Sequence, residues 1–204
     1  MATAGAGTVR RPWHGHALIG PAFDQVLAAA QTGAGWAFTR LYESLAPSVV
    51  GFLRARGVRE PEDVASEVFL SAFTNIARFA GNETQWRSWV FKIAYRRMVD
   101  HTRSEIRRGR SEAPEAPGGH HVVDAAATSA EGEALNRLGT ERVQEILAEL
   151  APDQADVLAL RVIADLSIDQ VAAALDKSPT AVKALQRRGL ATLRRRFSAE
   201  GVSP

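Results

Sequence analysis

The 204-residue sequence contains no cysteine. The chain therefore cannot form a disulfide, bind a metal through thiolates or use a cysteine nucleophile. This composition fits a protein of the reducing cytoplasm.

Long apolar runs are missing as well. No window approaches the roughly 20 apolar residues that a membrane-spanning helix needs, so we expect no membrane insertion. The opening residues, MATAGAGTVRRPWHGHALIG, lack the apolar stretch of a signal peptide. We expect residues 1–22 to form a flexible leader.

Motifs typical of enzymes are also absent. The sequence has no Gly-rich phosphate loop, no Gly-x-Ser-x-Gly turn and no His-Glu-x-x-His pair. Its carboxylate pairs fall on the polar faces of expected helices. An enzyme is therefore the rival class that these residues support least, and we expect neither catalytic residues nor a cofactor.

The charge is small in total but unevenly distributed. The formal net charge is +2, yet residues 87–110 carry eight Arg or Lys against two acids, and residues 177–196 carry seven and no acid. The stretch 111–165 between them holds eleven acids against three arginines. Two basic segments separated by an acidic one indicate two contact surfaces for a polyanion such as nucleic acid, rather than unrelated solvated faces.

The first basic segment contains residues 86–107, which have neither glycine nor proline and can form one helix. At 3.6 residues per turn, one stripe of this helix is basic, with Trp89 at its near end. The stripe consists of Lys92, Arg96, Arg103 and Arg107. Such a stripe is typical of a surface that contacts phosphates, and aromatic faces can stack on unpaired bases.

Two interpretations remain open for the tryptophans of this helix. Trp86 and Trp89 either stack on bases or pack in the core, since tryptophan is usually well buried. Asp100 lies three or four positions from three arginines, so it can fix the rotamers of their guanidinium groups.

Residues 61–79 predict a helix with a broad apolar face and a polar opposite face. The apolar positions are Val64, Ala65, Val68, Phe69, Ala72, Phe73 and Ile76. Asp63 and Glu67 on the polar side form a like-charge i,i+4 pair, which costs a few tenths of a kcal/mol. A partner that supplies cations would relieve this cost.

Residues 111–132 are rich in Pro, Gly, Ala, Ser and acids, and little in them can be buried. This composition predicts a linker. Two of the histidines lie in it and two in the leader, without the acidic neighbours that would complete a metal site. They are His14, His16, His120 and His121, and we expect no metal.

Helical periodicity returns from residue 140. Ser167 and Gln170 form a capping box that predicts a helix start. After a short turn, Ser178 and Pro179 provide the N-cap and first position of another helix. Two helices joined in this way indicate a helix-turn-helix. A hairpin that only mediates protein contacts is the alternative, but no acid occurs between Lys177 and Arg196.

The second helix of this pair has an outward face near the turns that enter a major groove in this motif. That face consists of Thr180, Lys183, Ala184, Arg187 and Arg188. The inward positions are Val182, Leu185, Gly189 and Leu193. We expect Lys183 and Arg187 to contact base edges, and Arg194 to Arg196 to contact phosphates or pack near the helix end.

Four segments, taken in order, resemble the extracytoplasmic-function sigma factors, a class of bacterial transcription initiation factors. They are WAFTRLYESLAPSVVGFLRARG, DVASEVFLSAF, WRSWVFKIAYRRMVDHTR and LAPDQADVLALRVIADLSIDQVAAALDKSPTAVKALQRRGLATLRRRF. The resemblance covers about residues 36–108 and 139–197.

The resemblance implies an all-α fold of two small domains. A region-two helical bundle would span residues 23–108, and a region-four helix-turn-helix would span residues 139–200. A flexible acidic linker, residues 109–138, would join them and thread near the active-site channel of the polymerase.

The resemblance also implies the partners and their sites. The chain would bind the clamp and flap regions of core RNA polymerase, and promoter DNA. The polymerase residues would be Glu62, Asp63, Ser66, Glu67, Phe69 and Leu70. Those at the minus-ten element would be Trp86, Arg87, Trp89, Lys92, Tyr95, Arg96, Arg97, Asp100 and Arg103, and those at the minus-thirty-five element Ser178, Thr180, Ala181, Lys183, Ala184, Arg187 and Arg188.

Some residues depart from the family pattern. Ser66 stands where a glutamine is usual in the clamp-binding helix, and Asp176 replaces the common glycine of the turn. Ala181 and Leu185 stand where threonine and arginine are often found. These departures leave the promoter sequence open without affecting the expected fold.

A stand-alone helix-turn-helix regulator is the nearest alternative. It would also be basic at its C-terminal end, but it leaves the basic aromatic helix and the acidic helix without a role. Binding of the purified chain alone to duplex DNA would distinguish the two. A further hypothesis concerns regulation: an anti-sigma factor wedged between the domains could block both functional faces.

Overall fold

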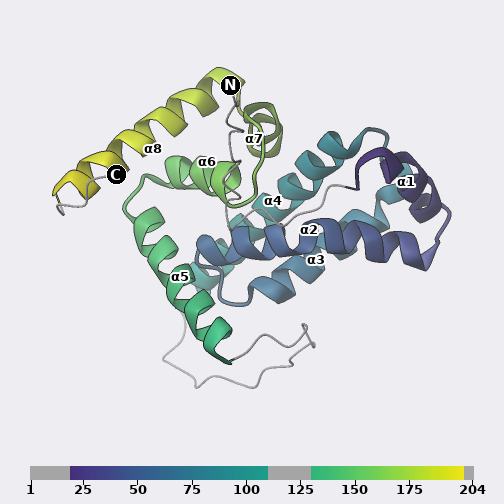
Figure 1. Cartoon of the computed structure of the whole chain (residues 1–204), viewed down its shortest axis with the longest axis horizontal. Coiled ribbons are helices and arrows are strands. Elements are labelled where there is room, and N and C mark those ends of the chain that lie inside the picture. Colours follow the sequence, from purple (N-terminus) through teal and green to yellow (C-terminus); the bar gives the residue numbers. More distant parts are fainter. Residues whose placement is uncertain (1–18, 110–129, 200–204) are drawn as a thin grey trace, which may run out of the picture.

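The computed structural model describes residues 19–109 and 130–199. The described residues are helical and contain no strand, which confirms the expected all-α fold (Figure 1). Most of the expected leader and linker, together with their four histidines, lie outside the described residues.

The first domain is built mainly from four α-helices. Its elements are η1 (Gly20–Ala22), α1 (Phe23–Gln31), α2 (Gly35–Ala55), α3 (Pro61–Thr74), η2 (Ile76–Arg78) and α4 (Glu83–Gly109). Helices α2, α3 and α4 pack side by side (Figure 1). Their shared core includes Phe52 and Phe91, whose rings meet edge to face at 6.1 Å.

Helix α3 buries the predicted apolar face, since Val64, Val68 and Ala72 are all buried. The helix is shorter than expected, however, and ends at Thr74. The Thr74 hydroxyl donates to Leu70 O at 2.7 Å, and the Asn75 amide donates to Ser71 O at 2.8 Å. Such bonds between side chains and the backbone compete with continuation of a helix, and the short turn η2 follows.

The second domain contains four helices. They are α5 (Ala130–Ala148), α6 (Pro152–Val162), α7 (Ile168–Leu175) and α8 (Pro179–Ala199). The linker was expected to extend to residue 138, but α5 begins at Ala130. The residues that follow include Glu131, Glu133, Ala134 and Leu135, which are strong helix formers. The last part of the expected linker is therefore helical.

The caps of the helix-turn-helix are confirmed. Ser167 and Gln170 form the predicted capping box, with Gln170 N donating to Ser167 Oγ at 3.2 Å and Ser167 N donating to Gln170 Oε1 at 2.7 Å. At the start of α8, Ser178 Oγ accepts a hydrogen bond from Ala181 N at 3.2 Å. These bonds satisfy backbone N–H groups that have no partner within the helix.

The inward face of α8 packs closely on α6. Val182 and Leu185 are buried. A Cβ atom added to Gly189 would lie only 2.9 Å from Leu158 Cδ1. This close approach explains a glycine inside α8, where it would otherwise weaken the helix.

The turn between α7 and α8 passes through Asp176, which has a left-handed backbone with φ of 57°. This conformation is unfavourable for residues with a Cβ atom and favours glycine. We therefore expect Asp176→Gly to raise the free energy of unfolding by up to about 1 kcal/mol. Urea unfolding followed by circular dichroism measures this change.

Asp169→Gly is the matched control, because Asp169 is an exposed residue of α7 with ordinary helical backbone. Here glycine should lower the free energy of unfolding by about 0.5–1 kcal/mol. Equal destabilisation by both substitutions would contradict the strain assigned to Asp176.

Candidate nucleic-acid and polymerase interfaces

Helix α4 carries the predicted basic stripe on its surface. Arg96, Arg103 and Arg107 are exposed, and Lys92 is half-buried. Trp89 is also half-buried at the near end of the stripe. The geometry of the stripe is as expected, and its contact with DNA remains a prediction.

The two tryptophans of α4 have different environments. Trp86 is only 1% exposed, and it packs against Phe73, Phe79 and Trp89. Of the two interpretations left open for Trp86, core packing is the one that this burial supports, because no face of the indole is accessible in this arrangement. Trp86 belongs to the core of the first domain.

Trp89, in contrast, borders a hollow between α3, η2 and α4. The hollow is open to solvent and has a volume of about 480 Å³. Its lining consists of Ser71, Asn75, Arg78, Phe79, Ala80, Trp89 and Ile93. The Trp89 ring stacks on Phe79 with centroids 5.2 Å apart. This wall combines an aromatic surface with amide and guanidinium groups, the groups that can stack on and hydrogen-bond to a base.

Arg87 does not share this surface. It is only 7% exposed, and its Nη2 donates to Ala164 O of the second domain at 3.0 Å. Burial lowers the pKa of Arg87, and the nearby carboxylates of Asp165 and Glu83 oppose that change. The expected contact between Arg87 and DNA is thus blocked in this arrangement of the domains.

Tyr95 also faces the second domain. Arg56 Nε lies 2.7 Å from Asp156 Oδ1, and the Tyr95 hydroxyl interacts electrostatically with the same carboxylate. Burial raises the pKa of Asp156, and Arg56 opposes that rise. Burial also raises the pKa of Tyr95, and the negative charge of Asp156 raises it further. The three side chains form one polar cluster between α2, α4 and α6.

This cluster predicts an unusual titration of Tyr95. With Tyr42→Phe as background, Tyr95 is the only tyrosine, and its ionisation should occur above the ordinary pKa of about 10. The stability that Tyr95 contributes is fully present below that ordinary pKa and is lost as the pH rises through the higher pKa of the folded chain. Tyrosinate absorbance measured against pH gives the midpoint.

Asp156→Asn should move the Tyr95 midpoint down, because it removes the negative charge beside the hydroxyl. Asp100→Asn is the matched control, since Asp100 is an exposed carboxylate of α4 itself. An unchanged midpoint in Asp156→Asn would contradict the coupling between Tyr95 and Asp156.

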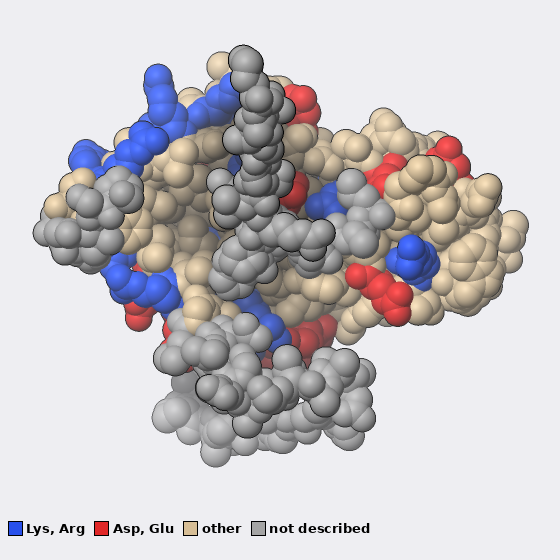
Figure 2. Space-filling view, in the orientation of Figure 1, with Lys and Arg blue, Asp and Glu red and all other residues tan. Residues whose placement is uncertain are grey.

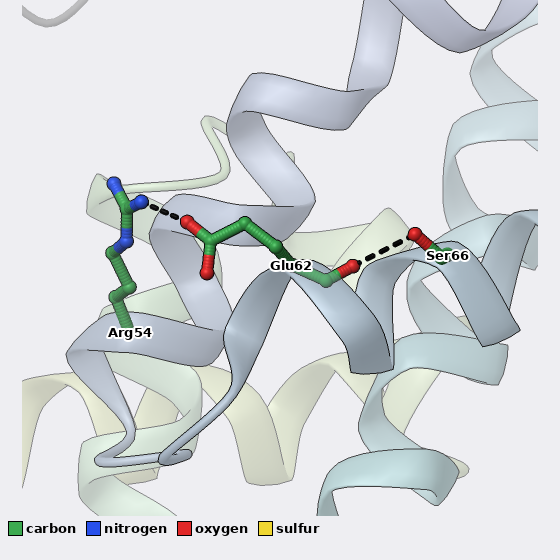
Figure 3. A network of polar contacts seen from close by, with 3 residues as sticks. All are labelled: Arg54, Glu62 and Ser66. Atoms are coloured by element: carbon green, nitrogen blue, oxygen red, sulfur yellow. Dashed lines mark hydrogen bonds and ion pairs between the residues drawn. The ribbon is translucent and has the colours of Figure 1, made fainter. Parts of the chain in front are cut away.

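Two arginines of the same chain form ion pairs with glutamates on the acidic face of α3. Arg54 of α2 pairs with Glu62, and Ser66 Oγ donates to Glu62 O at 2.9 Å (Figure 3). Arg97 of α4 lies 3.5 Å from Glu67. Asp100 was expected to hold some of its neighbouring arginines, and one of these, Arg97, is placed to neutralise Glu67. The like-charge pair of α3 is therefore relieved in part from within the chain.

The predicted polymerase residues divide into exposed and buried members. Asp63 and Ser66 are exposed, and Leu70 is 70% exposed. Phe69 is only 2% exposed, with its ring 4.8 Å from Tyr42. Phe69 therefore packs in the core, which gives no support to its expected contact with polymerase, whereas Leu70 presents an apolar side chain among the acidic residues.

Helix α8 presents the predicted recognition face. Thr180, Lys183, Arg187 and Arg188 are exposed, and Ala181 and Ala184 are half-buried. Figure 2 shows Lys and Arg side chains along the edge of the molecule where α8 lies. Near the end of the helix, Arg196 pairs with Glu149. Of the two roles considered for Arg196, packing is the one that this pair supports.

Neither the hollow nor the cluster around Asp156 was predicted from the sequence. Phe79 and Arg78 follow the end of α3, and their meeting with Trp89 depends on the turn η2. Arg56 and Asp156 are 100 positions apart. One feature of the sequence was consistent with the burial of Asp156: it lies between two apolar residues, Ala155 and Val157, which are also buried.

Two further properties concern membranes and metals. Among the described helices, none is long and apolar enough to cross a membrane. Within the same residues, no group of three or more histidines and carboxylates is placed to hold a metal ion.

Comparison with known families matches both domains. Residues 41–108 match the family described as Sigma-70 region 2, and residues 140–193 match the family described as Sigma-70, region 4. The two matches cover the helices that carry the basic stripe, the acidic face and the recognition face.

Individual relatives agree with this result. SigD of Mycobacterium tuberculosis, an ECF RNA polymerase sigma factor, is 30% identical over 190 residues, which cover 90% of this chain and 88% of SigD. BldN of Streptomyces coelicolor, another ECF RNA polymerase sigma factor, is 29% identical over 84% of this chain, and the match spans 64% of the length of BldN.

A solved structure supports the fold. CnrH, in complex with the cytosolic domain of CnrY, has a TM-score of 0.65 and 22% sequence identity, and the match covers 87% of this chain and 98% of CnrH. With both family matches and the identity to SigD, the chain belongs to the extracytoplasmic-function RNA polymerase sigma factors, the bacterial proteins that direct RNA polymerase to promoters.

Proposed function

We propose that three surfaces of the chain divide the work of promoter recognition. The acidic face of α3 binds core polymerase, the outer face of α4 holds the opened minus-ten element, and α8 reads the minus-thirty-five element. The observation that carries this proposal is the hollow beside Trp89, which lies at the near end of the basic stripe of α4.

The polymerase surface combines charge with one exposed apolar anchor. Leu70 is the apolar side chain, and Glu67 and Asp63 lie about one and two turns before it on α3. A single exposed leucine is common on protein surfaces, so the acidic charge around Leu70 is the main support for this assignment. We assign this face to the clamp of the largest subunit, and contact with the flap region to the second domain.

The minus-ten surface holds single-stranded DNA by two means. A base that leaves the duplex enters the hollow and stacks on Trp89, while Arg96 and Arg103 hold the phosphates of the same strand. Stacking tolerates any base, and the guanidinium groups follow the backbone. Lys92, at the half-buried edge of the stripe, adds charge near the hollow.

The minus-thirty-five surface reads duplex DNA through the first turns of α8. Thr180, Lys183 and Arg187 share one exposed face. Lysine and arginine in this position can donate to the acceptor atoms of guanine in the major groove. Arg194 and Arg195 lie further along the exposed side of α8 and contact phosphates.

No step of this function requires chemistry from the chain itself, since the polymerase forms the phosphodiester bonds. Because core polymerase and promoter DNA are in the bacterial cytoplasm, we expect the chain to act there.

Run-off transcription with core polymerase and a pool of genomic promoter fragments tests the proposal. We expect discrete transcripts only when the chain is added, from fragments that share two elements at a fixed spacing. Duplex binding by the chain alone, without any stimulated transcription, would favour a stand-alone helix-turn-helix regulator.

We also propose a protein partner that holds the chain inactive. The support is indirect: CnrH, whose fold is similar, forms a complex with the cytosolic domain of CnrY. Purification of the chain from unstimulated cells should recover such a partner. Recovery of polymerase alone would indicate control through expression.

A further inference from the structure

One wall of the hollow is held by the first helix of the chain. This wall belongs to residues 76–83, the wall segment, which runs from η2 to the start of α4 and supplies Phe79 and its two neighbours to the lining. Helix α1 packs against α2 and η2 (Figure 1). At its last residue, Gln31 donates from Nε2 to Ile76 O at 3.1 Å and to Phe79 O at 2.8 Å. One side-chain amide therefore spans the whole of η2.

The far end of the wall segment is tied to the same part of the chain. Glu83, the first residue of α4, accepts hydrogen bonds from Ile19 N at 2.6 Å and from Gly20 N at 2.9 Å. These two residues lie directly before α1, at the start of η1. The wall segment is therefore bonded to the N-terminal part of the chain at both of its ends.

The bonds from Gln31 require an amide at this position. Both partners are backbone carbonyls, which only accept hydrogen bonds, and a carboxamide nitrogen has two hydrogens to donate. A glutamate has nearly the same shape, but an ionised carboxylate has no hydrogen to donate and would repel the two carbonyls. Gln31→Glu therefore reverses the contact with little change in volume.

The position of Phe79 determines the shape of the hollow. Its ring stacks on Trp89 with centroids 5.2 Å apart, and it meets Trp86 edge to face at 5.4 Å. Trp86 is buried in the core, so Phe79 lies between a fixed residue and the aromatic side chain that borders the hollow. A shift of the wall segment would change the distance between Phe79 and Trp89.

The middle of the wall segment has little support of its own. In the described part of the chain, no backbone hydrogen bond outside the helices involves Ala80 or Gly81. The next bonds belong to the cap of α4, where Asn82 N donates to Gln85 Oε1 at 2.9 Å and Gln85 N donates to Asn82 Oδ1 at 3.0 Å. Support for this stretch therefore comes from Gln31 on one side and from the cap of α4 on the other.

We propose that α1 positions the wall segment for base capture and that Gln31 is the positioning residue. Gln31 acts through Phe79 and Trp89 and does not touch DNA itself. Helix α1 lies before residues 41–108, which match Sigma-70 region 2, so the match does not cover it. This inference rests on the proposed function of the hollow, because the position of the wall matters for transcription only if a base enters there.

Hydrogen exchange in the free chain tests the contact without polymerase or promoter. The amides of Arg78 and Phe79 close η2 through hydrogen bonds to backbone carbonyls. In Gln31→Glu these amides should exchange about 2- to 12-fold faster, which is the effect of losing one hydrogen bond. Gln31→Ala should act in the same direction. It adds no negative charge at the end of α1, so it separates the lost bonds from an effect of the helix dipole.

Gln25→Glu is the matched control. Gln25 is an exposed glutamine of the same helix, and the bonds from α1 to η2 come from Gln31 instead. This variant introduces the same charge and should leave the exchange of Arg78 and Phe79 unchanged. Wild-type exchange rates in both Gln31 variants, or equal acceleration in Gln25→Glu and Gln31→Glu, would overturn the inference.

Binding of single-stranded minus-ten oligonucleotides to the holoenzyme tests the consequence for DNA. Abasic replacements, one position at a time, identify the captured base as the position where wild type loses most affinity. Gln31→Glu should bind the intact oligonucleotide about fivefold more weakly than wild type, because part of the stacking is lost. On the oligonucleotide that is abasic at the captured position, the two proteins should bind equally. A weaker fold would instead lower binding to both oligonucleotides by the same factor, and that result would contradict a positioning role.

The two experiments separate this inference from the proposed function. If no abasic position affects wild type while exchange is faster in the Gln31 variants, the function proposed for the hollow is wrong, and the positioning of a base falls with it, although Gln31 still fixes the wall. If wild type shows a position-specific loss and Gln31→Glu binds both oligonucleotides as wild type does, the hollow keeps its function and the role of Gln31 is overturned.

Discussion

Replacing Trp89 with alanine should reduce promoter opening strongly while polymerase binding changes little. Trp89 supplies the aromatic wall of the hollow and stacks on Phe79. Stacking of a base on an aromatic side chain contributes about 1–3 kcal/mol, which corresponds to roughly a 5- to 150-fold loss of open complex. Permanganate reactivity of unpaired thymines measures the opening, and titration with labelled core polymerase measures the binding.

Trp36→Ala is the matched control, since Trp36 is 61% exposed on α2, away from the hollow. It should leave permanganate reactivity unchanged. Normal opening by Trp89→Ala, or an equal loss in the two variants, would contradict the role assigned to the hollow.

Arg187→Ala should relax the preference for one base pair of the minus-thirty-five element. Arg187 is exposed on the same face of α8 as Lys183. Loss of a base contact costs about 1–3 kcal/mol at one position and affects other sequences little. Transcription from promoters with single substitutions in the upstream element, at several salt concentrations, measures the effect.

Arg194→Ala provides the contrast, because Arg194 is exposed further along α8. Loss of a phosphate contact should weaken all promoters alike and reduce the slope of affinity against salt by about one. If Arg187→Ala weakened every promoter equally, its assignment to a base edge would be wrong.

The sequence predicted most of the fold because the helices are marked by local signals. The capping box at Ser167 and the Ser178–Pro179 start both depend on neighbouring residues only. The basic stripe likewise follows from helical spacing alone. Such features do not depend on how the helices pack.

For two buried aromatic residues, the family resemblance was followed instead of the helical spacing. Trp86 shares an i+4 row with Val90 and Ala94, which are both fully buried. Phe69 lies on the apolar face of α3 that the sequence itself defines. Both residues were assigned to interfaces from the family pattern, although their own helical positions indicated the core.

No local pattern in the sequence predicted the contacts between the two domains. Arg87 and Ala164 are 77 positions apart, and Gln170 and Thr84 are 86 positions apart. Each side chain had a sufficient local explanation, as a DNA contact or a helix cap. Only the packing of α7 on α4 shows that these residues also hold the two domains together.

The most direct test of the central claim combines one change in each DNA surface with one change in the promoter. Transcription by the wild-type chain, Trp89→Ala and Arg187→Ala is measured on an intact promoter and on one with a scrambled minus-thirty-five element. If α4 and α8 act on separate elements, scrambling should lower wild type and Trp89→Ala by the same factor and should affect Arg187→Ala distinctly less. An equal reduction in all three proteins would contradict the division of work between the two helices.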